Sequence, residues 1–216
     1  MKLKNQGLIV CGTDTNIGKT VISSLLVQGL HATYWKPIQS GLEDGSDTSR
    51  VREILNLPEE RCLPEAYKLN AAVSPHWAAE KENILISPDR LKIPVINNLL
   101  LIETAGGLMV PINRNLLQID QIKYWGFPIV LVARSGLGTL NHTLLSLEAL
   151  KSRGIPILGI FLNGVIHKDN PKTLEQFGDI PIIAQIPPFK ELSSSELSKA
   201  WTNHNLKEKF KVFHKD

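Results

Sequence analysis

The residues most capable of chemistry lie near the start of the chain, in the segment Gly12-Thr13-Asp14-Thr15-Asn16-Ile17-Gly18-Lys19-Thr20. Gly18, Lys19 and Thr20 match the end of the phosphate-binding pattern G-x-x-x-x-G-K-[ST], whereas Thr13 stands where that pattern begins with glycine. We expect Lys19 to reach the β- and γ-phosphates of a nucleotide and the Thr20 hydroxyl to bind Mg²⁺. A glycine turn capped by threonine is the alternative. It is disfavoured because an apolar run precedes the segment and an amphipathic stretch follows it.

Carboxylates that could hold a metal follow other apolar runs. Glu103 ends the run 99–102, at a point where nucleotide-hydrolysing proteins usually carry an aspartate that holds magnesium. Asp44 and Asp47 share a polar loop that leads into a helix, and by residue type alone either could be a ligand. Asp47 could equally be the N-cap of that helix.

Further polar residues stand at the ends of apolar runs. Lys36 follows the run 33–35, and its ammonium could either enter a site or extend to solvent. The segment 136–142 could be a loop with Thr139 as a helix cap, or a helix N-terminus that accepts an anionic group. Ser40 has no apparent His/Asp partner, which makes a serine hydrolase triad unfavourable. The six histidines show no metal-ligand spacing.

The elements that must position these residues alternate along the chain. Most of the apolar runs are apolar throughout, which is typical of parallel strands covered on both faces. The expected strands are residues 8–11, 33–35, 99–102, 129–133, 157–162 and 182–186. The expected helices are residues 19–30, 48–55, 75–82, 118–125, 139–153 and 171–177. This order predicts one domain, residues 1–216, with a doubly wound α/β fold: a mainly parallel sheet flanked by helices. Ligands collect at the carboxyl edge of such a sheet, where the polar residues above should converge.

Composition narrows the class of protein. The formal charge is only +3, and the basic stretch 207–211 reads as a frayed, solvated end, so no nucleic-acid partner is expected. Cys11 and Cys62 form no metal or redox spacing, and Cys11 reads as a buried small hydrophobe. The run 8–11 is far too short for a signal peptide or a membrane span, so we expect a cytoplasmic protein with no membrane partner.

Taken in order, these motifs resemble dethiobiotin synthetase of the biotin pathway. The resemblance rests on residues 12–20, Lys-Pro-x-x-Ser-Gly at 36–41, Ser74-Pro75-His76, Glu-x-Ala-Gly-Gly at 103–107, residues 138–142 and Asn163, and it covers residues 8 to about 190. It implies a P-loop NTPase-like fold. It also implies an ATP- and Mg²⁺-dependent ligase that forms dethiobiotin, ADP and phosphate from 7,8-diaminononanoate, CO₂ (or bicarbonate) and ATP, and a homodimer.

The resemblance also implies roles for individual residues. Lys36 is similar to the catalytic lysine, and Thr20, Asp47 and Glu103 to the magnesium ligands, which favours Asp47 over Asp44. The implied nucleotide-binding residues are Asn16, Ile17, Gly18, Lys19, Thr20, Val21, Asp47, Glu103, Thr104, Ala105, Gly106, Asn163, Gly164, Pro187, Pro188 and Phe189, with Asn163 reading the edge of the base. The implied substrate-binding residues are Thr13, Ser40, Gly138, Thr139, Leu140 and Asn141, the last four receiving the substrate's carboxylate tail from a neighbouring subunit.

Two positions depart from the family pattern. Thr104 stands where glycine is frequent and is expected to crowd the phosphates slightly. Gly164 stands where an acidic or amide residue often follows Asn163, so a partner for the base is missing and strict adenine preference is not implied. The tail after about residue 193 matches poorly and is assigned no role.

Three other functions compete with this interpretation. Partition and positioning ATPases on related folds carry an extra lysine near the start of the loop, where this chain reads Gly12-Thr13-Asp14. A cobyrinate-type amide ligase needs a glutaminase domain, for which 216 residues leave no room. A non-catalytic binding protein would not need Lys36, Asp47 and Glu103 together.

Overall fold

The computed structural model describes residues 6–213, so the predicted domain of residues 1–216 includes terminal residues outside this range. Its centre is a seven-stranded sheet with strand order β11-β10-β9-β1-β6-β2-β4, in which every pairing is parallel. These strands are β1 (Gly7–Gly12), β2 (Thr33–Trp35), β4 (Cys62–Leu63), β6 (Leu100–Glu103), β9 (Ile129–Arg134), β10 (Ile157–Asn163) and β11 (Ile182–Ile186). The predicted doubly wound α/β class is confirmed, and the six predicted strands all form.

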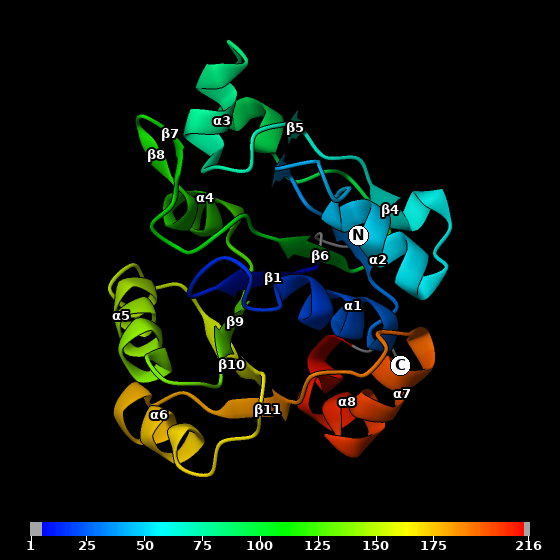
Figure 1. The fold of residues 1–216 in the computed structure, drawn as a ribbon, viewed down its shortest axis with the longest axis vertical. Helices are drawn as coiled ribbons and strands as arrows, with labels where there is room; N and C mark the ends of the chain where they lie inside the picture. The colour runs from blue at the N-terminus through cyan, green and yellow to red at the C-terminus, as the bar shows by residue number, and fades with distance from the viewer. Residues whose placement is uncertain (1–5, 214–216) are drawn as a thin grey trace, which may run out of the picture.

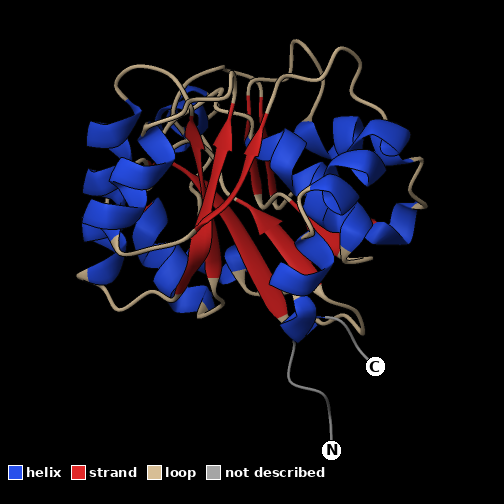
Figure 2. Ribbon diagram, turned by 90° about the horizontal axis from the view of Figure 1, so that it is seen from below, coloured by secondary structure: helices blue, strands red, loops and turns tan. Residues whose placement is uncertain are grey.

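Helices cover both faces of this sheet (Figure 2). They are α1 (Lys19–Gly29), α2 (Asp47–Leu55), α3 (Pro75–Lys81), α4 (Gln118–Trp125), α5 (Thr139–Lys151), α6 (Asn170–Gly178), α7 (Ser194–Asn203) and α8 (Leu206–Lys209). Residues of β1 alternate between the two cores: Leu8 and Val10 pack with α1, α2, α7 and α8, whereas Ile9 and Cys11 pack with α4, α5 and α6. Cys11 is therefore the buried small residue that its apolar context predicts.

A smaller layer lies above one end of the sheet, beside α3 at the top of Figure 1. Here β3 (Ile38–Ser40) pairs with β5 (Tyr67–Leu69), and β7 (Pro111–Asn113) pairs with β8 (Leu116–Leu117). A third apolar cluster, which includes Ile38, Leu69 and Ala78, holds this layer together. Sequence periodicity did not indicate β3 or β5, because a polar residue, Gln39 or Lys68, stands at the centre of each and interrupts any apolar run.

The C-terminal segment corrects one expectation. The stretch 207–211 is not a frayed end: it belongs to α8 and the short 3₁₀ turn Lys211–Phe213 that follows. Leu197, Leu206 and Phe210 of this segment are almost fully buried against the α1 face of the sheet. The lysines are exposed while the apolar residues between them face inward, so a charge run here is one side of an amphipathic segment.

Within residues 6–213, no helix combines the length and apolar character that crossing a bilayer requires.

Candidate active site

Residues 12–20 form a loop between β1 and α1. Gly18 has a left-handed backbone, with φ of 92°, and a Cβ there would lie 2.1 Å from the side-chain nitrogen of Asn163. Only glycine accommodates both the conformation and this close approach. The loop therefore delivers the backbone N–H groups at the start of α1 to open space, as phosphate binding requires.

Lys19 lies folded over this loop. Its Nζ donates a hydrogen bond of 2.6 Å to the Asp14 carbonyl, and the missing side chain of Gly12 leaves room for its aliphatic part. Burial lowers the pKa of the Lys19 ammonium to about 8, although the nearby Glu103 carboxylate opposes this effect. A lysine held in this way can turn toward a triphosphate placed in the loop.

Strand register brings the next two charged residues together. Trp35 of β2 pairs with Ile102 of β6, so the residues that follow them, Lys36 and Glu103, emerge side by side. The Lys36 Nζ lies 3.2 Å from Glu103 Oε1, and the side chain is only 7% exposed. The alternative in which this lysine extends to solvent is wrong, because its ammonium group is buried among carboxylates.

Asp47 completes an oxygen-rich cluster. Its Oδ1 accepts a hydrogen bond of 3.0 Å from the Thr20 hydroxyl, its Oδ2 pairs with Lys36, and the Thr20 hydroxyl also lies 3.0 Å from Glu103 Oε1. Burial opposes the charge on Lys36, but Glu103 and Asp47 outweigh it and raise the pKa of this lysine. Burial likewise opposes the charge on Asp47, but Lys36 outweighs it and lowers the pKa of Asp47. Both groups of the Lys36–Asp47 pair are thus charged near neutral pH.

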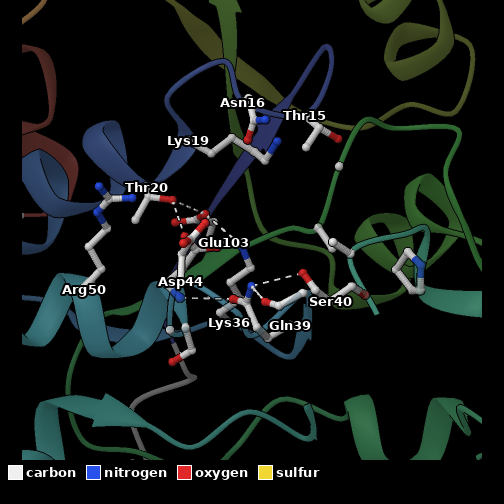
Figure 3. A pocket seen from close by; sticks show the side chains of 18 of the residues that line it. Thr15, Asn16, Lys19, Thr20, Lys36, Gln39, Ser40, Asp44, Arg50 and Glu103 are labelled. Carbon is white, nitrogen blue, oxygen red and sulfur yellow. Dashed lines mark hydrogen bonds and ion pairs between the residues drawn. The ribbon is translucent and has the colours of Figure 1, made fainter. Parts of the chain in front are cut away.

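The position of Asp47 in α2 decides whether this residue is the helix N-cap or a member of the charged cluster. Ser46 is the N-cap, because its side chain accepts a hydrogen bond from the Ser49 backbone N–H, and Asp47 is the first helical residue. The N-cap interpretation of Asp47 is wrong, and its carboxylate is free for the cluster. Asp44 lies in the wall of the same cavity but is exposed (Figure 3).

An open cavity of about 790 Å³ joins these groups. Figure 3 shows Thr20 on one side of Lys36 and Glu103, and Ser40 on the other. Ser40 lines this cavity, and its hydroxyl is buried without a hydrogen-bond partner among residues 6–213. The predicted residues that line this cavity are Asn16, Gly18, Lys19, Thr20, Val21, Lys36, Ser40, Asp47, Glu103, Ala105 and Gly106.

Several predicted residues lie elsewhere. Thr13 does not line the cavity, whereas Thr15 does. Thr104 is buried with its hydroxyl unpaired within residues 6–213, and it borders a separate small void rather than the phosphate side of the cavity. Among residues 6–213, Thr104 does not contribute to the cavity wall, and its expected crowding of the phosphates stays a prediction.

The predicted base-binding residues lie at one end of the loop. Asn163 Nδ2 donates a hydrogen bond of 3.1 Å to the Ile17 carbonyl, which places this amide against the loop. Gly164 has φ of 131°, and a Cβ there would lie 2.7 Å from Ser135 Oγ, so a larger residue would not fit without local movement. Pro187 and Pro188 are exposed and Phe189 packs on the core, while Leu192 lines the cavity.

Residues 138–141 open α5 at a distance from this cavity. Gly138 is exposed with φ of 88°, Thr139 is buried, and neither they nor Leu140 and Asn141 belong to the part of the cavity wall that residues 6–213 form.

Two residues that the sequence did not single out contact the cluster. The Tyr34 hydroxyl donates a hydrogen bond of 3.0 Å to Glu103 Oε2, and the Gln39 side chain accepts one from the Asp47 backbone N–H. Burial and then the Glu103 carboxylate raise the pKa of Tyr34 well above its ordinary value, so this hydroxyl keeps its proton. Nothing in residue type alone marks Tyr34 as the partner of the Glu103 carboxylate or Gln39 as the partner of the Asp47 backbone.

A parallel sheet whose first strand leads through a Gly-Lys-Thr loop into a helix, with a carboxylate on the adjacent strand, defines the P-loop nucleoside triphosphatase class. Comparisons with known proteins narrow this class. A family model described as an AAA domain matches residues 6–196. ATP-dependent dethiobiotin synthetase from Rhodopseudomonas palustris (strain BisB18) is 45% identical over 94% of this chain and 97% of its own length. The chain belongs to the dethiobiotin synthetase family.

Other matches agree with this assignment. ATP-dependent dethiobiotin synthetase from Brucella ovis is 43% identical over 93% of this chain and 94% of its own length. Among solved structures, the cell division ATPase MinD of Pyrococcus furiosus aligns with a TM-score of 0.59 and 18% identity, covering 98% of this chain and 100% of that one. The structural likeness establishes the fold alone.

Proposed function

We propose that this chain is an ATP-dependent dethiobiotin synthetase that closes a ureido ring on 7,8-diaminononanoate, using CO₂ and ATP and releasing ADP and phosphate. The observation that carries the proposal is the position of Lys36. Its ammonium lies between Asp47 and Glu103, next to the phosphate loop and within the cavity that Ser40 lines. A protein that only hydrolysed ATP would need the loop and one carboxylate, but not a second buried lysine facing the substrate side.

The chemistry explains why a second cation is required. One amine of the substrate takes up CO₂ as a carbamate, whose oxygen then attacks the γ-phosphorus of ATP and displaces ADP. Two anions must approach each other in this step, and fixed positive charge stabilises the transition state. Lys19 is placed to bind the phosphate side, and Lys36 to lie between the carbamate and the transferred group. In the second step the neighbouring amine attacks the carbonyl carbon of the carbamic-phosphoric anhydride. Phosphate leaves with the bonding electrons, and the amine loses a proton as the ring closes.

The protein mainly positions and neutralises the reactants. Ser40 and Lys36 both line the cavity, and in this proposal they orient the diamine. No covalent nucleophile is needed, because the substrate's own carbamate attacks the phosphorus.

Thr20, Asp47 and Glu103 fit a magnesium site. Their donor set is one hydroxyl and two carboxylates, and oxygen ligands are those that Mg²⁺ prefers. Both carboxylates lie within hydrogen-bond distance of the Thr20 hydroxyl. When bound, Mg²⁺ supplies positive charge that offsets the negative charge of the phosphate oxygens. We propose these three residues as its protein ligands.

We also infer a homodimer and a cytoplasmic location for this chain. Gly138 and the fully exposed Leu137 open α5, and the exposed Val165 follows Gly164, whose backbone lies against Ser135. An exposed apolar group beside a helix N-terminus suits a subunit contact that also receives the substrate's carboxylate tail. Sedimentation velocity of the wild-type protein and of Leu137→Asp tests the dimer. A wild-type protein that sediments as a monomer at micromolar concentration would exclude it.

The central experiment measures phosphate release with 7,8-diaminononanoate, bicarbonate and Mg²⁺, using either ATP or CTP. We expect release to depend on the diamine, and the two nucleotides to reveal how strictly the base is selected at Asn163 and Gly164. Release at the same rate without the diamine would contradict the ligase assignment and favour a plain ATPase.

A further inference from the structure

The side chain of Gln39 connects two parts of the cavity. It lies on β3, is only 7% exposed, and belongs to the cavity wall. Its Oε1 accepts a hydrogen bond of 3.1 Å from the Asp47 backbone N–H, and its Nε2 donates to the carbonyls of Ser40 and Gly41 at 3.3 and 3.2 Å. Both ends of the amide are thus used by backbone groups, which sets its orientation and leaves it holding the protein rather than a ligand.

These contacts add to two backbone hydrogen bonds of the same loop, from the Gly41 N–H to the Leu69 carbonyl and from the Gly45 N–H to the Leu42 carbonyl. Residues 41–46 connect β3 to α2, and Gly41 and Gly45 both have left-handed backbones, with φ of 80° and 82°. Glu43, Asp44 and Gly45 are exposed. A bond from residue 39 to residue 47 closes this loop and supplies an acceptor for one of the N–H groups that a helix leaves free in its first turn.

The oxygen and the nitrogen of the Gln39 amide contact different parts of the site. On one side Gln39 contacts the carbonyl of Ser40, a residue of the cavity wall that the proposed function assigns to the diamine. On the other it contacts the residue whose carboxylate meets Thr20 and Lys36. We propose that Gln39 is a positioning residue that sets the distance between the diamine side and the magnesium side of the cavity. This inference rests on the proposed function for its substrate, but not for its effect on Mg²⁺-dependent nucleotide binding.

Two substitutions distinguish the hydrogen bond that Gln39 accepts from the hydrogen bonds that it donates. Gln39→Met has similar length and removes every hydrogen bond. Gln39→Glu keeps an acceptor for the Asp47 N–H but replaces the amide donor with a carboxylate that faces two carbonyls. Gln121→Met is the control, since Gln121 is also buried, lies on α4 outside the cavity wall formed by residues 6–213, and donates from Nε2 to the Leu91 carbonyl.

The test combines calorimetric binding of a non-hydrolysable ATP analogue at increasing Mg²⁺ concentrations with steady-state kinetics and thermal melting. For Gln39→Met we expect the Mg²⁺ concentration for half-maximal binding and the diamine KM each to rise at least about tenfold, as loss of a residue supporting a metal ligand typically costs. For Gln39→Glu we expect a raised diamine KM with nearly wild-type Mg²⁺ dependence. Gln121→Met should lower the melting temperature without either change.

Unchanged Mg²⁺ dependence and diamine KM in Gln39→Met would overturn the proposal, as would a Gln39→Glu variant that shifts Mg²⁺ dependence while keeping the diamine KM. If Gln39→Met does not fold, Gln39→Glu still decides between these results. A wild-type enzyme that releases phosphate without the diamine would refute the proposed function instead, and the binding experiment would still test Gln39.

Discussion

The Tyr34 hydroxyl donates a hydrogen bond of 3.0 Å to Glu103 Oε2 at the carboxyl end of β6, where both residues are almost fully buried. The opposite oxygen of the same carboxylate faces Thr20 and Lys36. Glu103 is therefore held from behind by a neutral donor while its other oxygen is presented to the cavity. A buried carboxylate needs such partners, because desolvation strongly disfavours an unpaired charge.

The first prediction removes the hydroxyl group of Tyr34. Tyr34→Phe leaves Glu103 Oε2 without its donor, so the free energy of unfolding should fall by about 1–3 kcal/mol, and the Mg²⁺ concentration needed for nucleotide binding should rise. Tyr67→Phe is the control. Tyr67 is also buried and its hydroxyl accepts from the Ser87 backbone N–H, but it lies outside the cavity. Urea denaturation and Mg²⁺ titrations of both variants check this, and equal Mg²⁺ dependence in the two would contradict the role given to Tyr34.

The second prediction concerns Lys36. Lys36→Ala should lower kcat by about a hundredfold or more while the affinity for ATP changes only slightly, because the charge matters most where two anions meet in the transition state. Single-turnover phosphate release and equilibrium binding of an ATP analogue measure the two effects separately. Exposed Lys172→Ala is the control and should match the wild type. If kcat fell only a few-fold, Lys36 would not be central to the reaction.

The third prediction concerns Lys19, which is expected to bind phosphates in the ground state. Lys19→Ala should weaken binding of the triphosphate analogue more than binding of adenosine, because only the former carries the anionic groups that the ammonium contacts. Calorimetry with both ligands tests this difference. Unchanged triphosphate affinity would remove the assignment of residues 12–20 as the phosphate-binding loop.

The fourth prediction explains a departure from the family pattern. Gly164→Ala should destabilise the protein by about 1–3 kcal/mol, since φ of 131° is strained for any side chain and the Cβ would meet Ser135. Gly136→Ala is the matched control, because a Cβ there meets nothing within 4 Å and its backbone is not left-handed. Similar melting temperatures for the two variants would show that Gly164 is not required by the backbone.

The sequence predicted the strands and the charged residues of the site better than the side chains that hold those residues in place. Apolar runs located the six strands that it named to within one residue at each end, and the parallel order made Lys36 and Glu103 neighbours. It could not show that the Tyr34 hydroxyl binds the Glu103 carboxylate, or that the Gln39 side chain binds the backbone N–H of Asp47. Those contacts depend on side-chain direction between separate elements of the fold, which local pattern does not encode.

The C-terminal segment was missed for a different reason. Its basic residues suggested a solvated end, whereas a usable helix signal was present: Ser193 and Glu196 have the spacing of a capping box, and the Ser193 side chain accepts from the Glu196 N–H. Leu197 lies just inside that start and is fully buried. The charged residues indicated only the exposed face of the segment, whereas the spacing of its apolar residues indicated the face that packs on the core.

The last prediction tests whether that segment is part of the core. Phe210 is 1% exposed and its ring lies 6.3 Å from that of Phe161 on β10 and 6.2 Å from that of Trp201 on α7. Phe210→Ala should therefore cost about 3–5 kcal/mol, the range for emptying a buried phenylalanine site, whereas exposed Val212→Ala should have little effect. Urea denaturation monitored by tryptophan fluorescence measures both. The variant should still bind the ATP analogue normally at low temperature, because the segment stabilises the back of α1 and not the cavity at its start. A Phe210→Ala protein as stable as Val212→Ala would mean that the tail is not packed in solution.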